Sequence, residues 1–132
     1  MTRTSSPPRP LLRLVYDGPF SLTNQRAGHH WRIHNKERAD LRAWAAYETC
    51  RAGTAFDVPV VVEALMTTPH HQLADCDAIA PAVKHVIDGM VDGGAIPNDS
   101  PKWVRAVTYR APEKTDTRTL IVLMRPATNE ET

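Results

Sequence analysis

The run VPVVVEALMT at residues 58–67 is apolar at nearly every position and rich in β-branched valines. A strand of this kind is buried on both faces, which places it at the centre of a sheet. Helices on both faces would cover it, and so would a helix on one face and a partner on the other. Glu63 is the only charged residue in the run. We therefore expect the chain to fold around this strand.

Two helical patterns flank the run along the chain. Residues 36–51 have Asn35 as a candidate N-cap and Gly53 as a candidate C-terminal stop. Residues 80–91 carry apolar side chains at helical spacing and are followed by Gly93-Gly94. Each pattern predicts a helix with one face packed in the core.

Three further segments have the composition of strands: residues 11–16, 103–110 and 119–125, of which the last two are joined by a polar turn at 113–117. The elements then follow the order strand, helix, strand, helix, strand, strand. This order indicates an α+β fold with a small mixed β-sheet and two main helices.

Composition fits one domain. The chain has 132 residues, and its 42% hydrophobic and 23% charged content excludes an intrinsically disordered protein. We expect the domain to span residues 11–126, with a flexible proline-rich arm at 1–10 and a flexible tail at 127–132. The sequence has no apolar run long enough for a membrane span or a signal peptide, and Cys50 and Cys76 fit no disulfide framework. A cytoplasmic protein is the expectation.

Charge is unevenly distributed along the chain. The formal net charge is +1, but residues 1–56 carry +5, residues 57–100 carry −6 and residues 101–132 carry +2. A metal-dependent enzyme acting on a polyanion needs carboxylates for cations and basic residues for phosphates, which this pattern supplies. Chance in a short chain is the alternative explanation.

The acidic centre contains five aspartates within twenty-five residues and one base, Lys84. Lys84 and Asp88 are four residues apart and share a helical face. Carboxylates about 5 Å apart repel by roughly 3 kcal/mol at an effective dielectric near 20, so a close cluster favours a bound cation, with Mg²⁺ or Mn²⁺ preferred by oxygen ligands. The alternative is a solvated helix face with an ordinary ion pair. The aspartates are Asp75, Asp77, Asp88, Asp92 and Asp99.

The segment DCDAIAPAVKHVIDGMVDGGAIPNDS at residues 75–100 resembles the signature of the RusA family of Holliday-junction resolvases. The shared elements are an Asp-x-Asp pair, a Lys with an Asp four residues beyond it, a Gly-containing helix end and a final acidic pair. Upstream, Ser21-Leu22-Thr23-Asn24 resembles the family's loop after the first strand, so the resemblance covers residues 11–125. The chain departs from the family at Ala78, where Asn is typical, at Asn98 in the acidic pair, and in the wider spacing from Asp77 to Lys84.

The resemblance implies a RusA-like fold and a homodimeric, Mg²⁺-dependent crossover junction endodeoxyribonuclease, phage- or prophage-encoded and acting in DNA recombination and repair in a bacterial cytoplasm. By similarity, Asp75, Asp77 and Asp99 hold the metal and Lys84 neutralises charge on the phosphate. Asp88 is either a further metal ligand or a residue that orients Lys84, and its place four residues beyond Lys84 favours orientation. Asp92 is expected to be solvated. Two symmetric nicks in branched DNA require two sites related by a two-fold axis, which a homodimer supplies.

A basic stretch with an interleaved aromatic, Trp31, is predicted to be a loop suited to a DNA backbone. Its alternatives are an ordinary exposed loop and a zinc site at His30 and His34, although nothing completes a zinc motif. For the whole chain, the alternatives are a catalytically silent DNA-binding or structural protein on the same fold, and a metal hydrolase with another substrate. The candidate DNA-binding residues are Asn24, Arg26, His29, His30, Arg32, Lys36 and Arg38.

Overall fold

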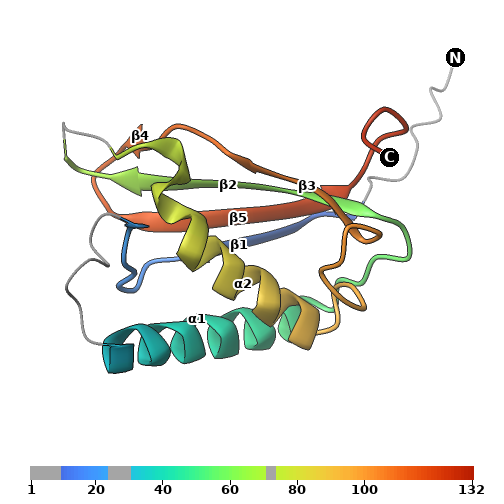
Figure 1. The fold of residues 1–132 in the computed structure, drawn as a ribbon, viewed down its shortest axis with the longest axis horizontal. Helices are drawn as coiled ribbons and strands as arrows, with labels where there is room; N and C mark the ends of the chain where they lie inside the picture. Colours follow the sequence, from blue (N-terminus) through green and yellow to red (C-terminus); the bar gives the residue numbers. More distant parts are fainter. Residues whose placement is uncertain (1–9, 24–30, 71–73) are drawn as a thin grey trace, which may run out of the picture.

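The computed structural model describes residues 10–23, 31–70 and 74–132. The predicted N-terminal arm lies almost entirely outside these residues. Within these ranges, two α-helices, one short 3₁₀ helix and five strands make up a single domain (Figure 1). In chain order the elements are β1 (Leu12–Tyr16), α1 (Trp31–Ala52), β2 (Val60–Thr68), η2 (Cys76–Ile79), α2 (Ala80–Asp92), β3 (Val104–Tyr109), β4 (Glu113–Lys114) and β5 (Thr119–Pro126).

The strands form one mixed sheet in the order β1-β5-β2-β3, with β4 also pairing with β2. β2 runs parallel to β3 and β4 but antiparallel to β5, and β1 is antiparallel to β5. The predicted α+β class with a mixed sheet is confirmed, and the run at 58–67 is the central strand. β3 and β5 are consecutive long strands, yet they lie on opposite sides of β2.

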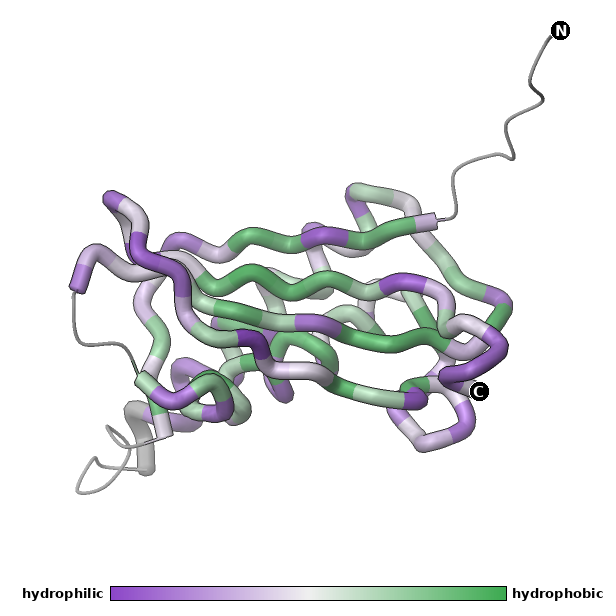
Figure 2. Tube along the Cα trace, turned by 90° about the horizontal axis from the view of Figure 1, so that it is seen from above, coloured by the Kyte–Doolittle hydropathy of each residue, from purple (hydrophilic) through white to green (hydrophobic). Residues whose placement is uncertain are grey.

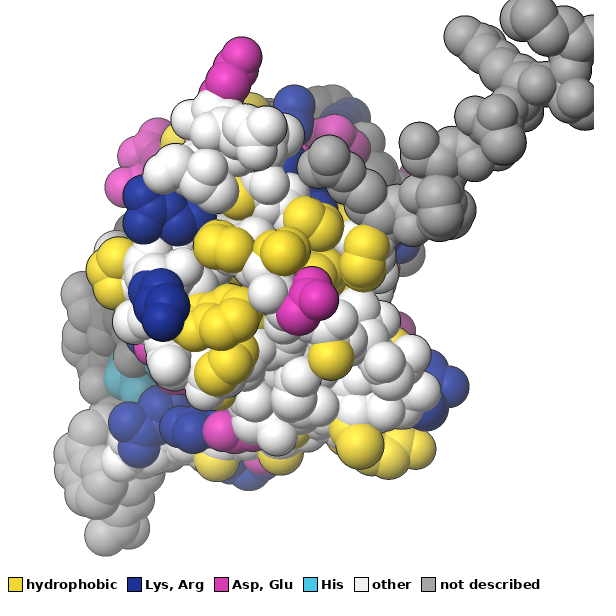
Figure 3. All heavy atoms as spheres, turned by 90° about the vertical axis from the view of Figure 1, so that its right-hand side faces the viewer, with side chains coloured by type: hydrophobic (Ala, Val, Ile, Leu, Met, Phe, Trp, Pro, Cys, Tyr) yellow, Lys and Arg dark blue, Asp and Glu magenta, His cyan; other side chains and the backbone are white. Residues whose placement is uncertain are grey.

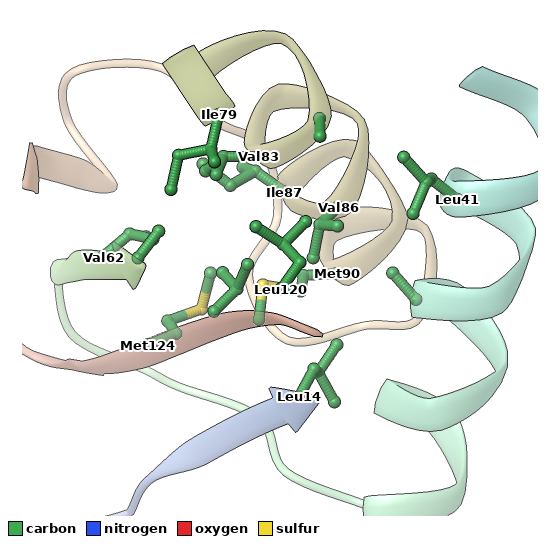
Figure 4. Close-up of a cluster of buried hydrophobic side chains, with 14 of the residues drawn as sticks. Leu14, Leu41, Val62, Ile79, Val83, Val86, Ile87, Met90, Leu120 and Met124 are labelled. Atoms are coloured by element: carbon green, nitrogen blue, oxygen red, sulfur yellow. The ribbon is translucent and has the colours of Figure 1, made fainter. Parts of the chain in front are cut away.

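Both helices lie on one face of the sheet (Figure 1). Alternate β2 side chains, Val60, Val62, Ala64 and Met66, point into the core with them and are at most 4% exposed. Of the two covers that the sequence left open for this strand, the described residues therefore show helices on one face only. In the core of Figure 4, Val62, Leu120 and Met124 of the sheet meet Ile79, Val83, Val86, Ile87 and Met90, and Leu41 comes from α1.

The first helix is longer than predicted. α1 begins at Trp31, so Asn35 lies inside it and is not the N-cap. An exposed Asn inside a helix is less favourable than Ala by only a few tenths of a kcal/mol. Packing of the neighbouring turns against the core stabilises the helix by more than this cost. The C-terminal stop is confirmed, because Gly53 has φ +68° and its N–H donates to the carbonyls of Thr49 and Cys50.

The two glycines after α2 have different roles. Gly94 has φ +94° and makes the turn, whereas Gly93 keeps helical dihedrals. A Cβ on Gly93 would lie 2.6 Å from the carbonyl oxygen of Ala46, and one on Gly89 would lie 2.4 Å from that of Arg42. Gly89 within α2 and Gly93 directly after it therefore allow α2 to lie directly against the backbone of α1.

The last residues of the chain fold back on β5. Both carboxylate oxygens of Glu131 accept hydrogen bonds from Arg125, at 2.9 and 3.0 Å, and one accepts a further bond from the backbone N–H of Thr128. These bonds lower the pKa of Glu131 from 4.5 to about 2. The flexibility expected for residues 127–132 stays a prediction. No helix in the described ranges is long and apolar enough to cross a membrane.

Candidate functional site

The Asp-x-Asp pair flanks the start of η2. Ala78 and Ile79 are buried and anchor this turn, while Asp75 and Asp77 are exposed. The N–H of Ala78 donates to the carbonyl of Asp75 at 3.0 Å and closes the turn. Because the buried residues fix η2 against the core, the two carboxylates are presented to solvent from a rigid position.

The loop after β1 docks on the same turn. Thr23 Oγ1 donates to the carbonyl oxygen of Ala78 at 3.1 Å, and the N–H of Ser21 donates to Glu37 of α1 at 2.5 Å. The side chain of Arg118 bonds the carbonyl of Phe20 at 2.7 Å and lies over its ring. The segment that resembles the family's loop is thus adjacent to the Asp-x-Asp pair, although Asn24 itself lies outside the described residues.

Lys84 projects from α2 between two carboxylates. Its Nζ lies 3.0 Å from Asp88 Oδ1 and also donates to Asp99 Oδ2. The Lys84 bond holds the pKa of Asp99 below its ordinary value of 3.8, and the bond to Asp99 raises the pKa of Lys84. The side chains of Lys84 and Asp99 are 55% and 40% exposed, so a ligand can reach both. The predicted pairing of Lys84 with Asp88 is present.

Asp99 reaches Lys84 because the chain turns back after α2. Gly94 begins this turn, and Asn98 Oδ1 accepts a hydrogen bond from the N–H of Ser100 at 3.0 Å across Asp99. Asn98, where the family has an acid, therefore shapes the loop that presents Asp99. Residues fifteen apart in the chain meet in this way.

Tyr109 is a candidate site residue that the sequence did not single out. Burial raises the pKa of its hydroxyl, and the negative charge of Asp77 raises it further. Tyr109 is the last residue of β3, which pairs in parallel with β2, the strand that leads to η2. The carboxyl ends of parallel strands lie at one edge of a sheet, so knowledge of this pairing would have indicated Tyr109.

The described residues contain no group of three or more His, Cys, Asp or Glu side chains that could hold a metal ion as they stand. The oxygen donors suit Mg²⁺. Asp99 is bound to Lys84 and is not gathered with Asp75 and Asp77 into such a group. The metal-ligand roles of Asp75, Asp77 and Asp99 stay a prediction.

Asp92 is exposed, as the sequence predicts, but it also has a partner on the other helix. Its carboxylate forms a two-point ion pair with Arg42 of α1, at 2.5 Å to Nε and 3.0 Å to Nη2. The close approach of the two helices brings Arg42 within reach. Because this ion pair joins the two helices, a substitution of Asp92 would also affect their packing. Asp92 is therefore unsuitable as a control for substitutions in the acidic cluster.

The predicted basic stretch is divided by the start of α1. Arg32, Lys36 and Arg38 lie within the helix and not in a loop, and Lys36 and Arg38 are exposed. Lys36 pairs with Asp40 at 2.7 Å. The remaining candidates, Asn24, Arg26, His29 and His30, lie outside the described residues.

No family model matches the chain, and no curated protein matches it either.

Proposed function

We propose that the protein is a Mg²⁺-dependent endonuclease that resolves four-way DNA junctions by paired, symmetric nicks. The observation that carries the proposal is the exposed Lys84 bound to both Asp88 and Asp99. This contact joins two parts of the segment that resembles the RusA signature. The loop at residues 21–23 lies against a third part, the turn at η2.

Each site residue has a role in this proposal. Asp75, Asp77 and Asp99 would hold the cation, which would supply an activated water and charge stabilisation at the scissile phosphate. Lys84 would neutralise negative charge on the phosphate during cleavage, and Asp88 would orient Lys84. The proposal requires that Asp99 move from Lys84 toward the Asp-x-Asp pair when the cation and DNA bind.

A second candidate is a catalytically silent DNA-binding or structural protein on the same fold. The separation of Asp99 from the Asp-x-Asp pair favours it, since the described carboxylates do not gather as a metal site. A silent DNA-binding protein would bind DNA as the nuclease does but would not cleave it, and a structural protein would do neither.

The test compares a labelled four-way junction with a linear duplex of the same sequence, in Mg²⁺ and in EDTA. The proposal expects paired nicks in the junction only with Mg²⁺, and little cutting of the duplex. Binding without cleavage would favour the silent protein. Equal degradation of the duplex would indicate a general nuclease instead.

A further inference from the structure

β1 forms one border of the sheet and leaves one row of its backbone groups open. It pairs with β5 in an unbroken register from Leu12 to Tyr16. Among the described residues, no hydrogen bond reaches the β1 backbone from the other side. Figure 2 shows β1 at this border of the sheet, and most of the strand is hydrophobic. Open N–H and C=O groups on an edge strand are a template for a further strand.

β1 lacks the features that usually block such an edge. It contains no proline and no bulge, its one charged residue is Arg13, and Val15 is 42% exposed. The opposite border, β3, has a register shift in its pairing with β2 between Val60 and Val61. An irregularity of this kind twists an edge away from a new strand. β1 is therefore the better of the two borders for accepting a strand.

α1 runs beside β1 in the opposite direction and forms the second wall of a groove. One hollow of about 460 Å³ lies where β1 begins and α1 ends, and Leu12 and Leu14 line it. Another, of about 270 Å³, lies where β1 ends and near the start of α1, beside Tyr16 and Phe20. The rings of Tyr16 and Trp44 contact each other, with centroids 4.9 Å apart, and hold β1 against α1. Every second side chain of an added strand would face these hollows.

The first hollow carries a positive charge. Arg13 lines it, is exposed, and has no ion pair within the described ranges. Glu48 and Arg51 also line it, but they pair at 2.9 Å and neutralise each other. Opposite charges attract when they face each other on neighbouring strands. An acidic side chain opposite Arg13 would therefore be favourable.

The second hollow carries a negative charge. Glu37 and Asp40 line it together with Lys36, which pairs with Asp40 at 2.7 Å. Burial raises the pKa of the Tyr16 hydroxyl, and the charges of Asp40 and Glu37 raise it further. The end of β1 therefore favours a basic side chain on an added strand.

We propose that this edge and groove bind an extended peptide segment of another protein, as a strand antiparallel to β1 with a basic residue followed three positions later by an acidic one. The basic residue would lie opposite Tyr16, an apolar residue opposite Leu14 and the acidic residue opposite Arg13. Antiparallel pairing is the more stable kind, and the backbone bonds supply affinity while side chains in alternate positions supply selectivity. The five residues of β1 span about 17 Å, so a peptide of about seven residues covers the edge.

The charges favour such a peptide over a second copy of β1. The sequence LRLVY of β1 has no acidic residue to offer Arg13. In two β1 strands paired antiparallel about Leu14, Arg13 would face Val15, and Leu12 would lie opposite Tyr16, where a basic residue is favoured. Peptide binding also does not depend on the proposed nuclease activity, because β1 and the strand that ends beside the Asp-x-Asp pair, β3, are opposite borders of the sheet.

The first experiment measures the affinity of the full chain, without DNA, for two end-blocked synthetic peptides of identical composition. Ser-Lys-Thr-Leu-Glu-Leu-Ser has the proposed order of charges, and Ser-Glu-Thr-Leu-Lys-Leu-Ser has the reverse. We expect the first to bind in the micromolar range and about tenfold more tightly than the second. Equal affinity for the two peptides, or no binding of either, would overturn the proposal.

The second experiment reverses the charges of the protein. Arg13 and Asp40 are exposed, so Arg13→Glu and Asp40→Lys remove no core contact. The double variant should prefer the reversed peptide by a similar factor, because both contacts again join opposite charges. Thermal melts check that it is folded. A folded double variant that keeps the wild-type preference would overturn the proposal.

Two exposed apolar residues provide a matched pair of variants. Figure 3 shows the end of the molecule at which β1 and β2 both begin, where hydrophobic side chains gather. Leu11 precedes β1, lines the first hollow and is 52% exposed, whereas Val58 precedes β2 and is 42% exposed. Leu11→Asp should weaken binding of the first peptide by about fivefold or more, and Val58→Asp should leave it unchanged. Equal losses in the two folded variants would overturn the assigned groove.

Hydrogen exchange of the backbone amides tests whether the peptide adds a strand. In the free protein, the β1 amides that point away from β5 should exchange quickly, and the first peptide should protect them. Protection before any peptide is added would mean that the chain itself or a second copy already covers the edge, and would overturn the proposal. Binding without new protection would also overturn it. Because none of these measurements uses DNA, their outcomes are independent of whether the protein cuts junctions.

Discussion

Lys84 lies between two carboxylates at an exposed position, where a simple ion pair contributes little to stability. Its contacts with Asp88 and Asp99 give it a fixed position on the acidic surface of α2. A positive charge held in place before substrate binds is most useful at a point where negative charge develops. In the proposed function, Lys84 therefore contributes to the reaction more than to folding.

Lys84→Ala should therefore lower the single-turnover cleavage rate by about 100- to 1,000-fold and leave junction affinity nearly unchanged. The measurement pairs the cleavage rate in Mg²⁺ with the affinity in EDTA. Arg51→Ala is the control, because Arg51 forms an exposed ion pair with Glu48 at the far end of α1. An affinity loss as large as the rate loss would make Lys84 a phosphate anchor only.

Asp75→Asn, Asp77→Asn and Asp99→Asn should each abolish cutting, since each keeps the side-chain shape but removes a charged oxygen ligand. Junction binding in EDTA should persist or tighten, because each change removes a charge that repels phosphate. Asp116→Asn, in the exposed turn before β5, is the control. Near-parental cutting by the folded Asp75→Asn and Asp99→Asn variants would exclude the assigned site.

The sequence predicts contacts between near neighbours better than contacts between distant residues. Spacing alone indicated the Lys84 and Asp88 pair, because residues four apart share a helical face. Only the resemblance brought Asp99 into the same site, since that contact depends on the turn at Gly94. The ion pair of Asp92 was not predicted, because its partner, Arg42, lies on another helix. Tyr109 was missed because the parallel pairing of β2 and β3 is not visible in local pattern.

At the level of elements, α1 and α2 are joined by close backbone packing and by one ion pair. The positions of both helices and of the long strands could be predicted from apolar periodicity, glycine stops and β-branched runs. The start of α1 could not, because an exposed Asn is compatible with both a cap and a helix interior. Local propensity differs too little between these states to fix a boundary.

Gly89→Ala should destabilise the protein by about 1–2 kcal/mol, although Ala is the better helix former. The new methyl group would lie 2.4 Å from the Arg42 carbonyl oxygen and 2.6 Å from Ala45 Cβ, so the helices would have to separate. Urea unfolding measures the change in the free energy of unfolding. A stabilised variant would mean that α1 and α2 do not pack this closely.

Asp92→Asn should reduce stability by less than about 1 kcal/mol at neutral pH, because the pair with Arg42 is partly solvated. Hydrogen bonding to Arg42 lowers the Asp92 pKa below its ordinary value of 3.8. The contribution is therefore complete above pH 3.8 and is lost as the pH falls through the lower, folded-state pKa. Urea unfolding of wild type and variant should differ at pH 7 and converge in stronger acid. A difference that persists unchanged in acid would exclude the ion pair as its cause.

For the whole molecule, the sequence predicted the fold class but not the order of strands. β3 and β5 are separated in the sheet by β2, and the short β4 marks the place where the chain crosses the end of that strand. Strand periodicity reports burial of each segment and contains no information on which segments pair. For the same reason, the apolar second face of β2 was recognised, but its cover was left open between a helix and a partner.

The proposed paired nicks lead to a prediction about how the two cuts are coupled. If dimerisation supplies the second site, diluting the protein below its dissociation constant should convert paired nicks into single nicks. A supercoiled plasmid that extrudes a cruciform distinguishes the outcomes, since paired nicks linearise it and a single nick relaxes it. Sedimentation at the same concentrations reports whether the protein is a dimer or a monomer. Linear product at concentrations where the protein sediments as a monomer would show that paired cuts do not require a dimer.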